Sequence, residues 1–164
     1  MNDRHRITED IVRLARQDVD LALDRANDLV GNLPQEVWTW SLRSYVHRVR
    51  KDYDNAFSDI DHAIEICFEN PASHTQKANH LLDIHKFEEA TYSYSTAIEI
   101  GEKIRDSYLD ELCRFKRAYC YCRIGDFEAA EADLNVVDDD MRFWFDRLRT
   151  KADLLHACEN RRLD

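Results

Sequence analysis

Glycine and proline are scarce in this chain, whose 164 residues include three Gly and two Pro. These residue types supply most tight turns, so their scarcity leaves little material for the many hairpins of an all-β fold. Long apolar runs are missing too, because no stretch approaches the roughly 20 apolar residues that cross a bilayer. A hydrophobic content of 44% still provides a core. We therefore expect one domain of long helices joined by short loops.

Positive charge is also in short supply, with 23 Lys and Arg against 33 Asp and Glu and a net charge of −10. Nucleic-acid binding needs a dominant basic surface, and an anionic membrane attracts basic segments. Neither partner is expected. The first residues, Met1–Arg6, lack the apolar core of a signal peptide, so the sequence predicts a cytoplasmic location.

Signatures of chemistry are missing as well. The five cysteines are odd in number and include no Cys-x-x-Cys pair, and Cys120 and Cys122 alone make no metal or redox motif. His80 and His85 are five residues apart, whereas metal ligands on one helix face are four apart. We expect no catalytic residue, no metal, no cofactor and no enzymatic activity. A metal- or thiol-dependent enzyme is the least favoured alternative.

What the chain does contain is an internal repeat. Ala22, Ala56, Ala90 and Ala130 end similar five-residue phrases and are 34, 34 and 40 residues apart. A fixed period near 34 residues indicates an array of helical hairpins, each burying its apolar face against its neighbours. The last interval is six residues too long, and we expect the extra residues, around 101–110, to lengthen both flanking helices.

Other residue types recur in the same register. Small residues recur at two positions, twelve residues before the shared alanine and seven residues after it. Aromatic residues occur sixteen residues before it in one repeat and nine residues before it in another. The small residues are Ser44, Ala78 and Ala118 before it and Ala63 and Ala97 after it, and the aromatic residues are Trp40 and Tyr121. This pattern resembles the tetratricopeptide repeat family. The chain departs from the usual pattern of this family at Arg43 and Arg117, where leucine is usual, and at Asp10, where a small residue is usual.

The resemblance implies an all-α, right-handed superhelix of helix-turn-helix repeats, closed by a capping helix. The expected repeats are 3–36, 37–70, 71–110 and 111–144, and the expected capping helix is 141–162, with Leu148, Ala152 and Leu155 on its inner face. All belong to a single domain spanning 1–164.

The resemblance also implies a binding site, because the first helices of such repeats line a concave groove. The residues at groove positions are Trp38, Leu42, Tyr45, Arg48, Gln76, Asn79, Phe115, Lys116, Tyr119 and Arg123. Aromatic residues interleaved with Arg and Lys are typical of interaction hot spots. The amides of Gln76 and Asn79 could bond an extended peptide backbone.

The predicted function is therefore binding of another protein or peptide segment in this groove, as a small acidic chaperone or adaptor. The sequence leaves open whether the chain forms a homodimer. Acidic residues concentrate in the second helices, which form the convex back in this family. An immunity protein or antitoxin that masks a basic toxin is thus an alternative, with Asp59, Asp61, Glu131 and Asp133 on the acidic surface.

Overall fold

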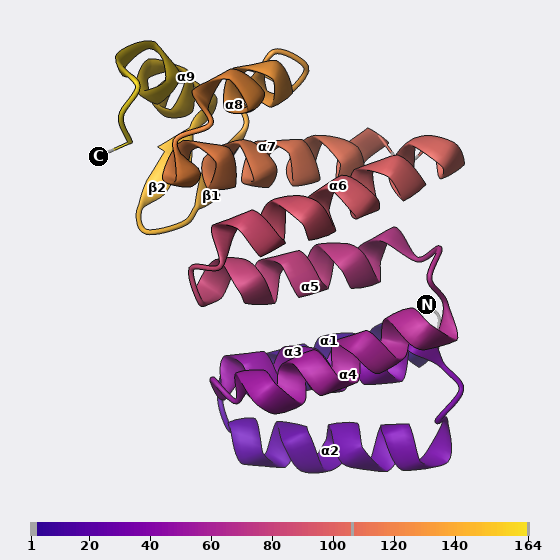
Figure 1. The fold of residues 1–164 in the computed structure, drawn as a ribbon. Coiled ribbons are helices and arrows are strands. Elements are labelled where there is room, and N and C mark those ends of the chain that lie inside the picture. The colour runs from indigo at the N-terminus through magenta and orange to yellow at the C-terminus, as the bar shows by residue number, and fades with distance from the viewer. Residues whose placement is uncertain (1–2, 106, 164) are drawn as a thin grey trace. The chain divides into compact units, whose positions relative to one another are not determined.

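The computed structural model describes residues 3–105 and 107–163 and confirms the all-α helical-hairpin fold, with one small β-hairpin near the C-terminus (Figure 1). The chain divides into two compact units, residues 1–80 (unit 1) and 81–164 (unit 2). Within the described ranges, no helix has the length and apolar character needed to cross a membrane.

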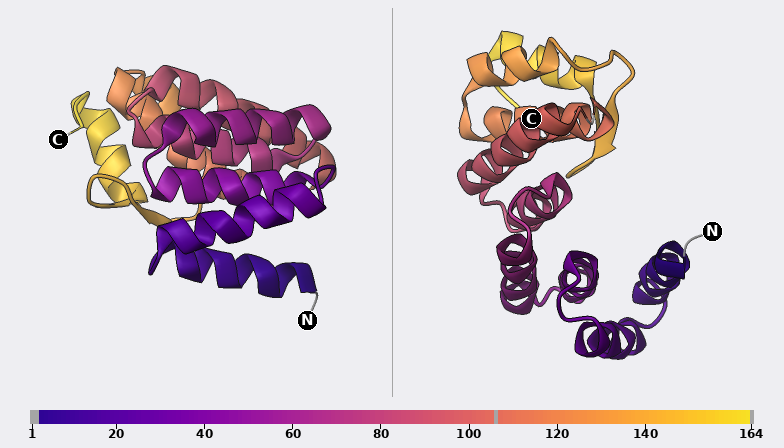
Figure 2. Two further views of the ribbon diagram at one scale, coloured as in Figure 1. Left: turned by 90° about the horizontal axis from the view of Figure 1, so that it is seen from below. Right: turned by 90° about the vertical axis from the view of Figure 1, so that its right-hand side faces the viewer.

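Unit 1 contains two complete helical hairpins and most of a fifth helix. Its elements are α1 (Asp3–Ala15), α2 (Val19–Asn32), α3 (Val37–Val49), α4 (Tyr53–Ile66) and α5 (Pro71–Asp83), the last of which continues into unit 2. The right-hand view of Figure 2 shows α1 to α4 nearly end-on, each packed beside the next. Its core includes Ile11, Ala22, Ala26, Leu42 and Val46.

The repeated phrase marks the start of each second helix. The side chains of Asp18, Asp52 and Asp126 accept a hydrogen bond from the backbone N–H three residues on, which caps α2, α4 and α8. Lys51 precedes the cap of α4, and Gly125 precedes the cap of α8. Both have a left-handed backbone, with φ of 65° at Lys51 and 84° at Gly125. Only glycine adopts this conformation without a steric penalty.

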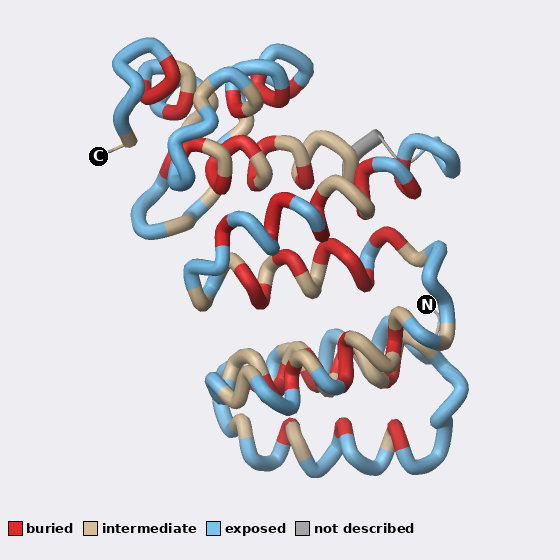
Figure 3. Tube along the Cα trace, viewed as in Figure 1, coloured by how far each residue is buried: buried red, intermediate tan, exposed pale blue. Residues whose placement is uncertain are grey.

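The shared alanines are fully buried. Ala22, Ala56, Ala90 and Ala130 have no exposed surface, and the buried side of α2 follows one edge of that helix in Figure 3. A larger side chain at these positions would separate the paired helices, so the alanine register sets how closely each hairpin closes.

Unit 2 contains longer helices and the β-hairpin. Its elements are α6 (Phe87–Ile104), α7 (Ser107–Ile124), α8 (Phe127–Leu134), β1 (Arg142–Trp144), β2 (Leu148–Thr150) and α9 (Lys151–Asn160). Helices α6 and α7 each have 18 residues, against 13 or 14 in α1 to α5, which confirms that the longer interval extends both flanking helices. Asp106, within the expected extension, lies outside the described residues.

The C-terminal segment corrects one expectation. The capping helix was expected from residue 141, but α9 begins at Lys151, and β1 and β2 pair antiparallel with Trp144 opposite Leu148. The aromatic run before Asp146 suits a strand better than a helix. Thr150 and Asp153 form a reciprocal capping box, which fixes where α9 starts.

Candidate partner-binding surfaces

The first helices of the repeats in unit 1, α1, α3 and α5, line a solvent-open cavity of about 290 Å³. Its wall comes from α1, α3 and α5 and from the residue before α5. The lining residues are Arg4, Thr8, Val12, Trp38, Ser41, Leu42, Tyr45, Asn70, Ala72 and Gln76. Four of the ten residues that the sequence predicts for partner binding are therefore brought together here: Trp38, Leu42, Tyr45 and Gln76.

Two half-buried aromatic rings dominate this cavity. The guanidinium of Arg4 lies 5.4 Å from the Trp38 ring centre, and that of Arg48 lies 5.5 Å from the Tyr45 ring centre. Such cation–π contacts favour one orientation of each ring. Leu42 is 5% exposed and belongs to the core cluster against which both rings pack. The result is a mainly apolar surface on rigid helices, with Arg48 beside it.

The side-chain amides of Gln76 and Asn79 both lie on α5, and that of Gln76 is bonded within unit 1. The Gln76 amide nitrogen donates to the Ser41 carbonyl oxygen at 2.6 Å, which joins α5 to α3. Asn79 is half-buried on α5 and is not among the residues that line the cavity. Peptide-backbone bonding by either amide stays a prediction.

A buried polar cluster joins α3, α4 and α5. The Ser44 hydroxyl donates to the Ala56 carbonyl oxygen at 2.7 Å and lies 2.7 Å from His80 Nε2. Because the serine proton is used, the histidine nitrogen is the donor in the second bond. Burial, with a smaller contribution from Arg48, lowers the pKa of His80 to about 3. His80 is therefore neutral at physiological pH and serves as a tie between α3 and α5.

The arginines that depart from the family pattern form buried ion pairs. Arg43 donates to both carboxylate oxygens of Asp59 at 2.7 and 2.8 Å, and Arg117 does the same to Asp133 at 2.6 and 2.7 Å. Asp59 and Asp133 are each 4% exposed. The pairs link the first and second helix of their repeats, where leucine would otherwise pack.

These pairs correct the expected acidic surface. Asp59 and Asp133 are buried in ion pairs and so are not on the surface, whereas Asp61, whose side chain is 49% exposed, accepts a bond from Lys77 Nζ at 2.7 Å. Glu131 is exposed. Local ion pairing therefore accounts for part of the charge asymmetry between the helices.

In unit 2 the β-hairpin covers the face that the sequence predicts to be open. Phe115, Lys116 and Tyr119 on α7 are 0%, 5% and 3% exposed, contrary to the expectation for a groove surface. The Phe145 ring stacks on Tyr119 with centres 3.9 Å apart and planes 4° apart, and Lys116 Nζ lies 4.0 Å from the Phe143 ring centre. The chain's own segment thus occupies this surface.

The remaining predicted residue, Arg123, is exposed at the edge of this cluster. Its guanidinium donates to the Tyr119 hydroxyl at 3.0 Å and lies 4.7 Å from the Phe87 ring centre. Arg123 therefore braces the tyrosine on the side of α6.

The hairpin has two distinct faces. Phe143, Phe145 and the 2%-exposed Arg149 point inward, whereas Trp144 is 70% exposed and Leu148 lies opposite it. Arg149 bonds the Asp146 carboxylate and lowers the pKa of that carboxyl to about 2. The run of three aromatic residues, Phe143 to Phe145, is the sequence signal that would have favoured a strand over a helix here.

Three of the five thiols, those of Cys120, Cys122 and Cys158, are buried and give little sign of reactivity. Burial raises the pKa of Cys120 to about 12 and also raises the pKa values of Cys122 and Cys158, whose sulfur atoms lie 3.9 Å apart. These thiols remain protonated at neutral pH, and the thiolate is the nucleophilic form. Over the described part of the chain, no three His, Cys, Asp or Glu side chains are grouped to hold a metal ion.

Comparison with known proteins identifies the fold. No protein-family model and no curated protein matches the chain. Among solved structures, PilW, a type IV pilus biogenesis factor, aligns with a TM-score of 0.67 and 18% identity over 82% of this chain and 60% of that one. A chain of the Naa15/Naa10 structure bound to HypK-THB aligns with a TM-score of 0.53 and 15% identity over 82% of this chain and 24% of that one.

At this identity, the likeness shows the fold alone. The chain spans less than two thirds of either similar structure. The class is thus a helical-repeat protein, and membership of the tetratricopeptide family stays a prediction from the repeat pattern.

Proposed function

We propose that this chain is a non-enzymatic protein-interaction module that binds a partner segment in the cavity of unit 1. The observation that carries the proposal is the convergence of Trp38, Leu42, Tyr45 and Gln76 on one open cavity between α1, α3 and α5. Large aromatic residues on a rigid scaffold lose little conformational freedom on binding, and they dominate measured interaction hot spots.

Unit 2 supports the choice of unit 1. The corresponding face of α7 is buried under Phe143 and Phe145, whereas Trp38 and Tyr45 remain half-buried. One of the similar structures is itself a complex, with HypK-THB bound. A chaperone or adaptor role is the form of this function that we favour. The immunity-protein alternative is weaker, because Asp59 and Asp133 are not on an acidic surface.

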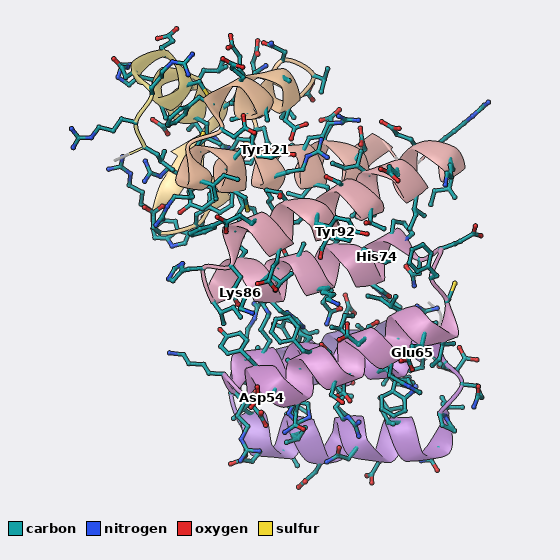
Figure 4. The ribbon with its side chains drawn as sticks, in the orientation of Figure 1. Asp54, Glu65, His74, Lys86, Tyr92 and Tyr121 are labelled. Atoms are coloured by element: carbon teal, nitrogen blue, oxygen red, sulfur yellow. The ribbon has the colours of Figure 1, made fainter. Side chains whose placement is uncertain are left out.

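Site-specific cross-linking tests the proposal. A photoreactive residue in place of Ser41, at the cavity wall, should capture a partner in cells, whereas the same residue in place of Tyr92 should not capture it. Tyr92 is 76% exposed on α6 and is labelled in Figure 4. Purified partner should then bind Tyr45→Ala at least tenfold more weakly than wild type, since a hot-spot truncation costs roughly 2 kcal/mol or more.

Tyr92→Ala is the matched control and should bind like wild type, with both variants keeping wild-type helix content by circular dichroism. Equal partner binding by wild type, Trp38→Ala and Tyr45→Ala in calorimetry would rule out the cavity as the binding site.

A further inference from the structure

Unit 2 contains an occupied example of the surface that is open in unit 1. Phe145 lies flat on the Tyr119 ring and is 5.9 Å from the Phe115 ring centre, while Phe143 lies over Lys116. The occupant is the start of the β-hairpin, in which Phe143 on β1 and Phe145 directly after β1 contact α7, while Trp144 between them is exposed. Its mode of binding shows what a first helix of this chain accommodates.

Tyr45 is the counterpart of Tyr119. Each tyrosine lies eleven residues before the shared alanine of its repeat, Ala56 or Ala130. Each has an arginine near its ring, with Arg48 at 5.5 Å from Tyr45 and Arg123 at 5.9 Å from Tyr119.

The helical frame around the two tyrosines is also shared. The bidentate pairs Arg43–Asp59 and Arg117–Asp133 occupy the same repeat positions and both span 16 residues. They join first helix to second in the same way. The backbone that presents each tyrosine is therefore held by the same contact.

Two differences define what the open surface accepts. Tyr119 is 3% exposed, whereas Tyr45 is half-buried and lines the cavity of about 290 Å³. Lys116, which meets the Phe143 ring, is replaced at the same repeat position by Leu42. The neighbouring contact in unit 1 is thus apolar.

We propose that the cavity of unit 1 binds an extended partner segment through an aromatic side chain stacked on Tyr45, with a second apolar side chain two residues earlier against Leu42. This inference rests on the proposed function and adds the chemistry of the partner. The aromatic ring fits because aromatic pairs gain affinity beyond the area that they bury.

A random-peptide display library, selected on the full-length wild-type chain, tests the inference. Selected peptides should be enriched in an aromatic residue preceded, two positions earlier, by an apolar one. In calorimetry, Tyr45→Leu should weaken a selected peptide about 2- to 12-fold, because leucine keeps apolar contact but loses the ring pair. Tyr45→Phe should retain the affinity, and Tyr92→Leu is the control for an exposed tyrosine.

A substitution in the peptide keeps the test independent of protein folding. Changing the aromatic residue of the peptide to leucine should weaken binding to wild type by a similar factor and should add no further loss on Tyr45→Leu. Selected peptides that need Trp38 but have no aromatic preference would overturn the inference and leave the proposed function in place. A selection that yields no peptide dependent on Trp38 or Tyr45 would overturn both.

Discussion

Arg43→Leu should destabilise the chain because it leaves the Asp59 carboxylate buried without its main partner. The side chains of Arg43 and Asp59 are 20% and 5% exposed, and the nearest other ion-pair partner of Asp59 is His47, at 3.7 Å. Breaking a buried pair by removing one member costs about 3–5 kcal/mol. Since Arg43 is partly exposed, we expect about 3 kcal/mol, which is a drop of roughly 6–12 °C in Tm for a chain of this size.

The double variant Arg43→Leu/Asp59→Leu should recover most of this loss. Replacing both members of a buried pair by apolar residues is often neutral or stabilising. The unfolding free energy of the double variant should therefore lie within about 1 kcal/mol of wild type, so adding Asp59→Leu to Arg43→Leu should restore roughly 2 kcal/mol.

Urea unfolding followed by circular dichroism measures these free energies. The control is Arg13→Leu, which breaks the pair with Asp10 at 3.2 Å, where both side chains are more than half exposed. Such surface pairs contribute about 0–1 kcal/mol. An Arg43→Leu variant no less stable than Arg13→Leu, or a double variant no better than the single one, would refute the reasoning.

Two further predictions concern His80 and Lys51. Because the folded-state pKa of His80, about 3, lies below the ordinary value of 6.5, the unfolded chain binds the proton first as the pH falls. Protonation of this group should lower the free energy of unfolding between pH 6.5 and 3 by at most about 1.4 kcal/mol per pH unit. The urea midpoint of His80→Leu should therefore fall less than that of wild type when the pH is lowered from 7 to 4.5. Lys51→Gly should raise the unfolding free energy by up to about 1 kcal/mol, because φ at Lys51 is 65°; an unchanged or lower midpoint would contradict this strain.

Much of the fold could be predicted from the alanine register. Ala56 and its counterparts recur with a period typical of helical-hairpin arrays, and Asp18, Asp52 and Asp126 before three of them cap helices. The same register places Tyr45 and Trp38 on the cavity wall, because first-helix positions repeat with the hairpin.

The C-terminal hairpin was missed because the repeat was extrapolated past its end. Counting 34 residues beyond Ala130 placed Leu148 in a helix, whereas the consecutive aromatic residues Phe143, Trp144 and Phe145 favour a strand, and Leu148 pairs with Trp144 in β2. Burial of the α7 surface depends on that hairpin, so the prediction for Tyr119 failed with it.

The ion pairs were missed for a different reason. Arg43 and Arg117 could be recognised from sequence only as departures from a leucine position, and each partner aspartate was counted with the surface. Arg43 and Asp59 are 16 residues apart, as are Arg117 and Asp133, and this recurrence of opposite charges was visible in the sequence.

Because the β-hairpin covers this face of α7, an outside ligand could bind there only by displacing Phe145 from Tyr119. Phe145 belongs to the same unit as Tyr119, so a free peptide must compete with an intramolecular contact, for which short flexible linkers give effective concentrations of about the millimolar order. A free peptide with the same intrinsic affinity would have to exceed that concentration to displace it. The equivalent faces of α3 and α7 therefore differ in availability, because only the α7 face is held by a tethered competitor.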